Sequence, residues 1–233
     1  MNYFAHGRNF LSDPYFLAGT AVPDWLSAVD RRVRVKSKHA APFLGPAAAR
    51  LAALAAGIQQ HYRDDRWFHR TRAFAEISWQ LTVAVRDALP GDDGFRPSFL
   101  GHILLEILLD AALIADAPQQ LDAYYAAFAG LDAVAVRDGV SQMAHQPVES
   151  LAVFIPGFCG ERFLYDYLDD AKLLARLNRV MRRVQLPTLP DRFVELLPSA
   201  RQTVRRRRDE LLAGEDQRSL IAEDQHHTTG DLP

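Results

Sequence analysis

One segment of the chain constrains its fold more than any other. Residues 99–113 are apolar around the whole circumference of a helix, apart from three ionisable residues. Such a helix belongs in the interior of a protein, because none of its sides suits water. The exceptions are His102, Glu106 and Asp110, which are spaced four residues apart and therefore lie along one face. Burying two carboxylates there is costly unless positive charge compensates them.

That compensating charge has two possible sources. A metal ion bound by the histidine and the carboxylates is one. A buried salt-bridge network with Arg72 or Arg86 is the other, and it would satisfy the same side chains without any ligand.

A second set of residues with the same spacing lies upstream: His61, Asp65 and His69. Histidines at either end of a carboxylate, on one helical face, are typical of metal sites. Four residues of helix rise about 6 Å, so the outer members of such a set are about 12 Å apart and one ion cannot join all three. Two ions about 3.5–4 Å apart could use both sets on facing helices. A single ion taking one or two residues from each set fits equally well.

His6 and Asp24 complete the candidate site. His6 stands in an aromatic and apolar setting at the start of the chain, and Asp24 ends a short apolar stretch. Each has an ordinary alternative, since a lone histidine in such a setting is usually a packed residue. The upstream set could also be an exposed helix face, because Arg63, Asp64 and Arg66 surround it.

The rest of the chain predicts an all-α fold of about seven helices in a single domain, residues 1–212. Residues 213–233 are polar and aperiodic, and we expect them to form a disordered tail. The expected helices cover residues 47–60 running on to about 87, 98–115, 121–128, 132–143, 161–184 and 191–212, with a turn at 90–94 and a connection at 154–160.

Composition excludes several classes of protein. Lysine and arginine number 27 against 29 acids, giving a net charge of −2, so no overall basic field indicates nucleic acid. One cysteine, Cys159, cannot form a disulfide framework or a Cys-based zinc finger. The start of the chain lacks the pattern of a signal peptide, and no run reaches about 18 uncharged apolar residues. We therefore expect a soluble cytoplasmic protein with no membrane partner; its oligomeric state stays open.

The order of three motifs resembles a known family. They are Met-Asn-Tyr-Phe-Ala-His at residues 1–6, Ala18-Gly19 through Pro23-Asp24-Trp25, and Ala56-Gly57-Ile58-Gln59-Gln60-His61 with Asp65. This order, over roughly the first 115 residues, resembles acyl carrier protein phosphodiesterases. That resemblance implies a helical fold related to HD-domain phosphohydrolases, a divalent cation such as manganese, and cleavage of the phosphopantetheine arm from acyl carrier protein. The site positions that it implies are His6, Asp24, His61, Asp65, His102 and Glu106.

The chain also departs from that family. Gln59 stands where the family tends to have a histidine, and His69 and His102 stand where it often has acids. The two histidines favour softer ions such as zinc or iron over magnesium. Residues 101–111 are in addition similar to zinc-dependent phospholipase C proteins, which are all-α as well. Both resemblances imply a metal-dependent phosphoesterase, and they differ in the substrate.

The resulting hypothesis is phosphodiester hydrolysis with a metal-activated water. Asp65 or Asp110 would accept the proton from that water, and His69 would protonate the leaving oxygen or serve as a further ligand. Arg63 and Arg66 would neutralise phosphate charge. Two alternatives compete with this hypothesis. One is a non-catalytic helical binding or scaffold protein of the same descent, which the missing histidine at position 59 favours. The other is a metal enzyme outside phosphate chemistry, such as an oxygenase.

Overall fold

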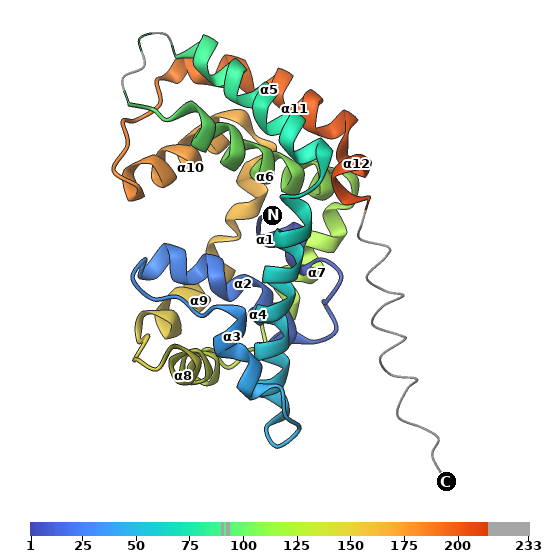
Figure 1. Ribbon diagram of the computed structural model, residues 1–233, viewed down its shortest axis with the longest axis vertical. Helices are drawn as coiled ribbons and strands as arrows, with labels where there is room; N and C mark the ends of the chain where they lie inside the picture. The colour runs from blue at the N-terminus through green and yellow to red at the C-terminus, as the bar shows by residue number, and fades with distance from the viewer. Residues whose placement is uncertain (90, 92–93, 214–233) are drawn as a thin grey trace.

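The computed structural model describes residues 1–89, 91 and 94–213, and within these ranges the chain forms helices and no strand. The prediction of a single all-α domain is confirmed (Figure 1). The α-helices are α1 (Tyr3–Gly7), α2 (Pro14–Val29), α3 (Ser37–Ala40), α4 (Ala49–Phe68), α5 (Arg72–Ala88), α6 (Pro97–Asp116), α7 (Pro118–Phe128), α8 (Ala133–Ala144), α9 (Ser150–Glu161), α10 (Asp170–Arg183), α11 (Leu197–Arg206) and α12 (Arg208–Leu212). Short 3-10 helices are η1 (Ala41–Phe43), η2 (Phe163–Leu168) and η3 (Asp191–Leu196).

Several helices differ from the sequence-based expectation. The count of about seven is too low, because the structure has twelve α-helices in the part of the chain it describes. Residues 154–160, expected as a connection, lie inside α9, where Pro156 and two glycines are tolerated. Residues 161–184 do not form one helix, since Arg162 adopts a left-handed conformation and η2 intervenes before α10. The turn at 90–94 and the tail at 213–233 lie largely outside the described residues.

Helix α6 is the core of the upper half of the molecule in Figure 1. It packs against α5, α11 and η2, and most of its apolar residues are fully buried. Its length and composition would also suffice to cross a membrane, but 67% of the relevant window is buried inside this fold. Gly101 lets it approach α5 closely, because a Cβ there would lie 2.6 Å from Oγ1 of Thr82.

The closest crossing in the lower half joins α2 to α4. A Cβ on Gly19 would lie 2.2 Å from the carbonyl oxygen of Leu54, and one on Gly57 would lie 2.0 Å from that of Phe16. Only glycine fits at these two positions, so the backbones touch. This contact fixes how far α4 is shifted along α2. It therefore also fixes the position of His61, which lies one helical turn after Gly57.

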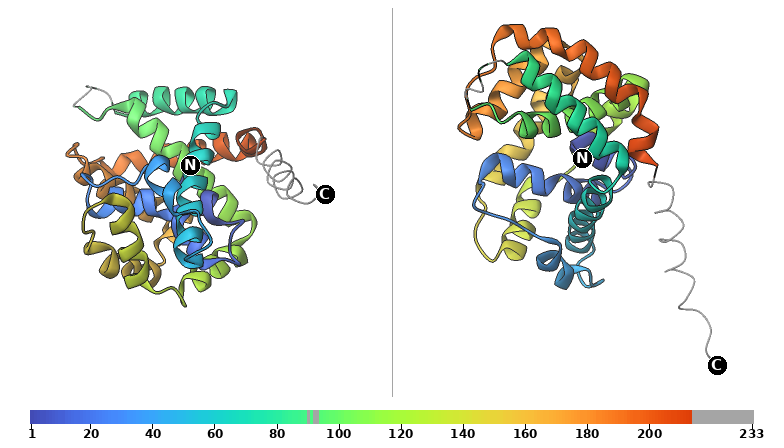
Figure 2. Two further views of the ribbon diagram at one scale, coloured as in Figure 1. Left: turned by 60° about the horizontal axis from the view of Figure 1, so that its bottom comes forward. Right: turned by 45° about the horizontal axis from the view of Figure 1, so that its top comes forward.

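The beginning of the chain lies at the centre of the molecule, where α1 is enclosed by α2, α4, α6 and α7 (Figures 1 and 2). All five residues of α1 are buried. Asp110 on α6 holds this helix, because its carboxylate accepts hydrogen bonds from the backbone N–H of Phe4 at 3.0 Å and of Ala5 at 2.8 Å. The two halves of the fold therefore meet around α1.

Candidate metal centre

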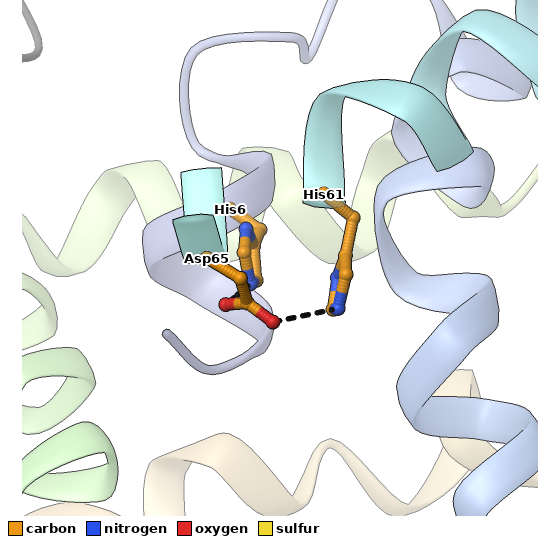
Figure 3. Close-up of side chains that lie close together, drawn as sticks. All are labelled: His6, His61 and Asp65. Atoms are coloured by element: carbon orange, nitrogen blue, oxygen red, sulfur yellow. Dashed lines mark ion pairs between the residues drawn. The ribbon is translucent and has the colours of Figure 1, made fainter. Parts of the chain in front are cut away.

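The first group of potential metal ligands consists of His6 on α1 with His61 and Asp65 on α4. Its ligand atoms all lie within 4.8 Å of one another. The Nε2 atom of each histidine is 3.3 Å from an oxygen of Asp65, and the two rings stack at 4.1 Å between centroids. Figure 3 shows the rings side by side, with the Asp65 carboxylate at their edges. Both histidines are buried, whereas the Asp65 side chain is 28% exposed.

The outer nitrogen of each ring is already engaged. Nδ1 of His61 donates to the backbone carbonyl of Thr20 at 2.9 Å, and Nδ1 of His6 lies 3.2 Å from Oδ2 of Asp64. A carbonyl oxygen only accepts, so Nδ1 of His61 carries a hydrogen, and Nε2 is the ring nitrogen that faces Asp65. A lone pair and a carboxylate oxygen at 3.3 Å repel each other unless a proton or a metal ion lies between them.

The second group consists of His69, His102 and Glu106, again with all ligand atoms within 4.8 Å of one another. Nε2 of His69 lies 3.0 Å and Nε2 of His102 lies 3.2 Å from the same oxygen, Oε1 of Glu106. His69 is the C-terminal cap of α4, so the loop to α5 begins at this ligand. Phe74 packs edge-on against both imidazoles and forms an apolar wall behind them.

A single positive group joins the two clusters. The α-ammonium of Met1 donates to Oδ1 of Asp65 at 2.8 Å and to Oε1 of Glu106 at 2.9 Å. The residue is 5% exposed. Burial lowers the pKa of this amine, but the two carboxylates outweigh that effect and raise it to about 10. The place between the clusters thus attracts a cation.

The carboxylates of both clusters are held ionised. Burial by itself raises the pKa of Asp65, but hydrogen bonds from the histidines of its own group, and the Met1 ammonium, bring it well below the usual range. Glu106 behaves in the same way, with burial opposed by Met1 and by its two histidines. Deprotonated carboxylates are the form that binds a metal.

Asp24 lies beside the clusters and belongs to neither. It lines the same cavity as Met1 and Glu106, and its buried Oδ2 has no hydrogen-bond partner among the described residues. Burial raises its pKa to about 6, although the charge of His61 opposes the shift. A buried oxygen without a partner costs free energy that a bound cation or donor would recover.

Asp110 belongs to neither group of potential metal ligands. It is fully buried, and both of its oxygens accept backbone N–H groups of α1. Burial raises its pKa to about 7, and those two hydrogen bonds oppose the shift. Asp110 therefore holds α1, and with it His6, whereas its expected role as acceptor of a proton from water stays a prediction.

The arginines singled out in the sequence lie elsewhere. Arg72 pairs with Glu76 at 2.6 Å, so it does not neutralise the charges along α6. Met1, His69 and His102 face Glu106 instead. Arg63 and Arg66 line a separate shallow groove with Trp67, Arg70 and Thr71.

Three residues that the sequence analysis did not select support the first cluster. Asp64 is 1% exposed and fixes the ring of His6, and Gln60 donates to Asp64 at 2.6 Å. The carbonyl of Thr20 orients His61. A carboxylate or carbonyl behind a histidine is the usual support of a metal ligand. Asp64 stands next to Asp65 in the sequence, but its contact with His6 could not be predicted, because it depends on where α1 packs in the fold.

The clusters have the dimensions of a metal site. Bonds of 2.0–2.1 Å in a tetrahedral zinc site place neighbouring ligand atoms about 3.4 Å apart. In the first group both imidazole Nε2 atoms lie 3.3 Å from a carboxylate oxygen of Asp65. In the second group the two Nε2 atoms lie 3.0 and 3.2 Å from Oε1 of Glu106. Imidazole combined with carboxylate suits zinc, iron and manganese. Each of the two groups could therefore hold a metal ion.

Comparisons of this chain with protein-family models, with curated proteins and with solved structures find no match.

Proposed function

We propose that this protein is a metal-dependent phosphodiesterase that hydrolyses a phosphodiester at the paired histidine–carboxylate clusters. One observation carries the proposal: both imidazoles of the first cluster have their Nδ1 atoms engaged, and their Nε2 atoms face one carboxylate at 3.3 Å. Two such clusters, adjacent through the Met1 ammonium, resemble the centres of two-metal hydrolases.

Each residue has a role in this proposal. His6, His61 and Asp65 would hold one ion, and the cluster around Glu106 would hold a second, with Asp24 available to either. Ions bound there would lower the pKa of a bound water and polarise a phosphoryl oxygen. Asp24 suits the transfer of a proton, because its pKa of about 6 lies close to neutrality.

The family resemblance points to acyl carrier protein as the substrate, or to the phospholipid-like esters of zinc-dependent phospholipases C. An HD-domain-like relationship belongs to the same proposal. The apolar wall of the adjoining cavity, which includes Phe99, Ile103 and Phe154, favours a substrate with an apolar portion next to the phosphodiester.

Metal content provides the first test. Untagged protein, loaded with manganese, zinc or iron and then desalted, is expected to retain one or two ions per chain. The His61→Ala/Glu106→Ala double variant should lose them, together with hydrolysis of bis(p-nitrophenyl) phosphate. His145→Asn is the matched control, because His145 lies outside both clusters in a left-handed position that asparagine tolerates.

Two results would contradict the proposal. Wild-type protein that keeps no ion would favour a non-catalytic scaffold, in which the Met1 ammonium alone neutralises the carboxylates. Bound iron without phosphodiesterase activity would favour a metal enzyme outside phosphate chemistry.

A further inference from the structure

Glu106 of the second cluster lines a cavity of about 560 Å³, together with Met1, Asp24 and several arginines. Its acidic lining residues are Asp24, Glu106 and Glu161. Its basic residues come from the segment after α2 and from α10, and they are Arg31, Arg34, Arg176, Arg179 and Arg183. In Figure 1, α2 and α10 face each other across the middle of the molecule.

Two of these arginines are already neutralised. Arg176 pairs with Asp166 at 2.7 Å and with Glu161 at 3.1 Å, and Arg179 lies 3.5 Å from the same Glu161 carboxylate. Arg176 also lies over the ring of Phe163, 4.9 Å from its centroid. These contacts give the two side chains a structural role.

The other three form no ion pair with a carboxylate among the described residues. They are Arg31, Arg34 and Arg183, and all three are exposed. The segment that carries Arg34 is anchored, because Val33 and Val35 on either side of it are 4% and 1% exposed. Arg31 donates to the backbone carbonyl of Arg183 at 3.2 Å, which ties this segment to the end of α10. Three positively charged residues from two separate elements thus line the same cavity.

Like charges gathered without counterions repel one another, and a bound anion relieves that repulsion. Guanidinium groups are well suited to phosphate and carboxylate oxygens. Apolar side chains such as Ile103, Phe154 and Val180 line the cavity together with the charged residues. The cavity as a whole matches a molecule with an ester next to Asp24 and Glu106, an apolar body, and a further anionic group next to the unpaired arginines.

We propose that Arg31, Arg34 and Arg183 form an anion subsite that binds a second anionic group of the substrate, at a distance from the phosphodiester that is hydrolysed. The assignment of a second group rests on the proposed function, because it takes the clusters as the place of hydrolysis. It defines the substrate class as esters with two anionic groups separated by an apolar portion.

The subsite is tested first without metal. Phenyl phosphate, which combines an anionic group with an apolar ring, is titrated by calorimetry into wild-type protein stripped with a chelator, at low ionic strength. The Arg34→Ala/Arg183→Ala variant is expected to bind at least about tenfold more weakly. The matched control is Arg32→Ala/Arg182→Ala, which removes two adjacent arginines that do not line the cavity. It should bind like the wild type.

Equal weakening in both double variants would overturn the proposal, because it would indicate unspecific attraction to basic surface. Equal binding by the wild type and the Arg34/Arg183 variant would overturn it too, as would absence of binding to the wild type. Because no metal is present, these outcomes do not depend on whether the clusters hydrolyse anything. A protein that binds phenyl phosphate through these arginines but retains no metal would refute the proposed function alone.

Metal-loaded protein provides the second test. The Arg32→Ala/Arg182→Ala control should hydrolyse every ester at about the wild-type rate, because neither residue lines the cavity. A p-nitrophenyl phosphodiester with a terminal phosphate on its other arm should show a KM raised about tenfold in the Arg34→Ala/Arg183→Ala variant. An unchanged KM for this ester would overturn the proposal.

Discussion

Nδ1 of His61 donates to the backbone carbonyl of Thr20 at 2.9 Å, across the crossing of α2 and α4. The two residues are 41 positions apart in the sequence. Thr20 comes directly after Gly19, and His61 lies one helical turn after Gly57, and these two glycines allow the close contact of α2 with α4. Packing of the backbones therefore sets the orientation of a candidate ligand. A substitution at this crossing should therefore lower both the free energy of unfolding and the affinity of the candidate metal centre for an ion.

Gly57→Ala tests that coupling. The new methyl group would meet the carbonyl of Phe16 at 2.0 Å, and backbone on both sides cannot yield without separating the helices. We expect a loss of about 3 kcal/mol in the free energy of unfolding, measured by urea denaturation. Any folded fraction should also bind metal more weakly. Gly45→Ala is the control, because a Cβ there meets nothing within 4 Å.

Asp64→Asn tests the support of His6. Asp64 receives Gln60 on one oxygen and faces Nδ1 of His6 with the other, and an amide offers only one oxygen. We expect metal affinity to fall about 10- to 100-fold, measured by competition with a chromophoric chelator, with the helical circular dichroism retained. Asp138→Asn, at an exposed ion pair on α8, should leave the affinity unchanged. Unchanged affinity in Asp64→Asn would mean that His6 is not a ligand.

Asp110→Ala removes the acceptor beneath α1. Two buried N–H groups, of Phe4 and Ala5, would lose their partner, which costs about 2–5 kcal/mol in total. Asp110→Asn keeps one acceptor oxygen, so its loss of stability should be about half as large. Chemical denaturation of the three proteins gives the ranking. If both variants were as stable as the wild type, Asp110 would not hold α1.

The lowered pKa of Glu106 leads us to expect that the metal-free protein becomes less stable at acidic pH. Its pKa is lowered in the folded protein from a usual value of 4.5, so the unfolded chain binds a proton that the folded chain does not. Stability present at neutral pH is therefore lost as the pH falls below about 4.5. In Glu106→Gln the free energy of unfolding should fall less steeply with decreasing pH, by up to about 1.4 kcal/mol per pH unit. This is the slope that one additional proton bound by the unfolded chain produces.

The measurement is urea denaturation of chelator-treated protein between pH 5 and 2. Wild type and Glu106→Gln should differ in slope below about pH 4.5 and down to pH 2, because over this range the unfolded wild-type chain protonates Glu106 whereas the folded protein keeps it ionised. Parallel slopes would show that the pKa of Glu106 is not lowered by its neighbours.

Local periodicity made much of the fold predictable. An apolar circumference from residue 99 to 113 identified α6 as a buried helix. The same periodicity failed for residues 154–160, because proline and glycine disfavour a helix locally while Leu151, Ile155 and Phe158 bury the same face of α9. Burial outweighed propensity there.

The sequence by itself determined which ionisable residues share a helix face, since a spacing of four residues fixes that relation without reference to the rest of the chain. It thus indicated both sets of histidines and carboxylates. Tertiary structure decided how the sets are divided. His61 and Asp65 join His6, whereas His69 crosses to His102 and Glu106, and Asp110 turns to the backbone of α1. The physical reason is that distances between helices depend on how closely their backbones pack, and periodicity along one helix carries no information about that.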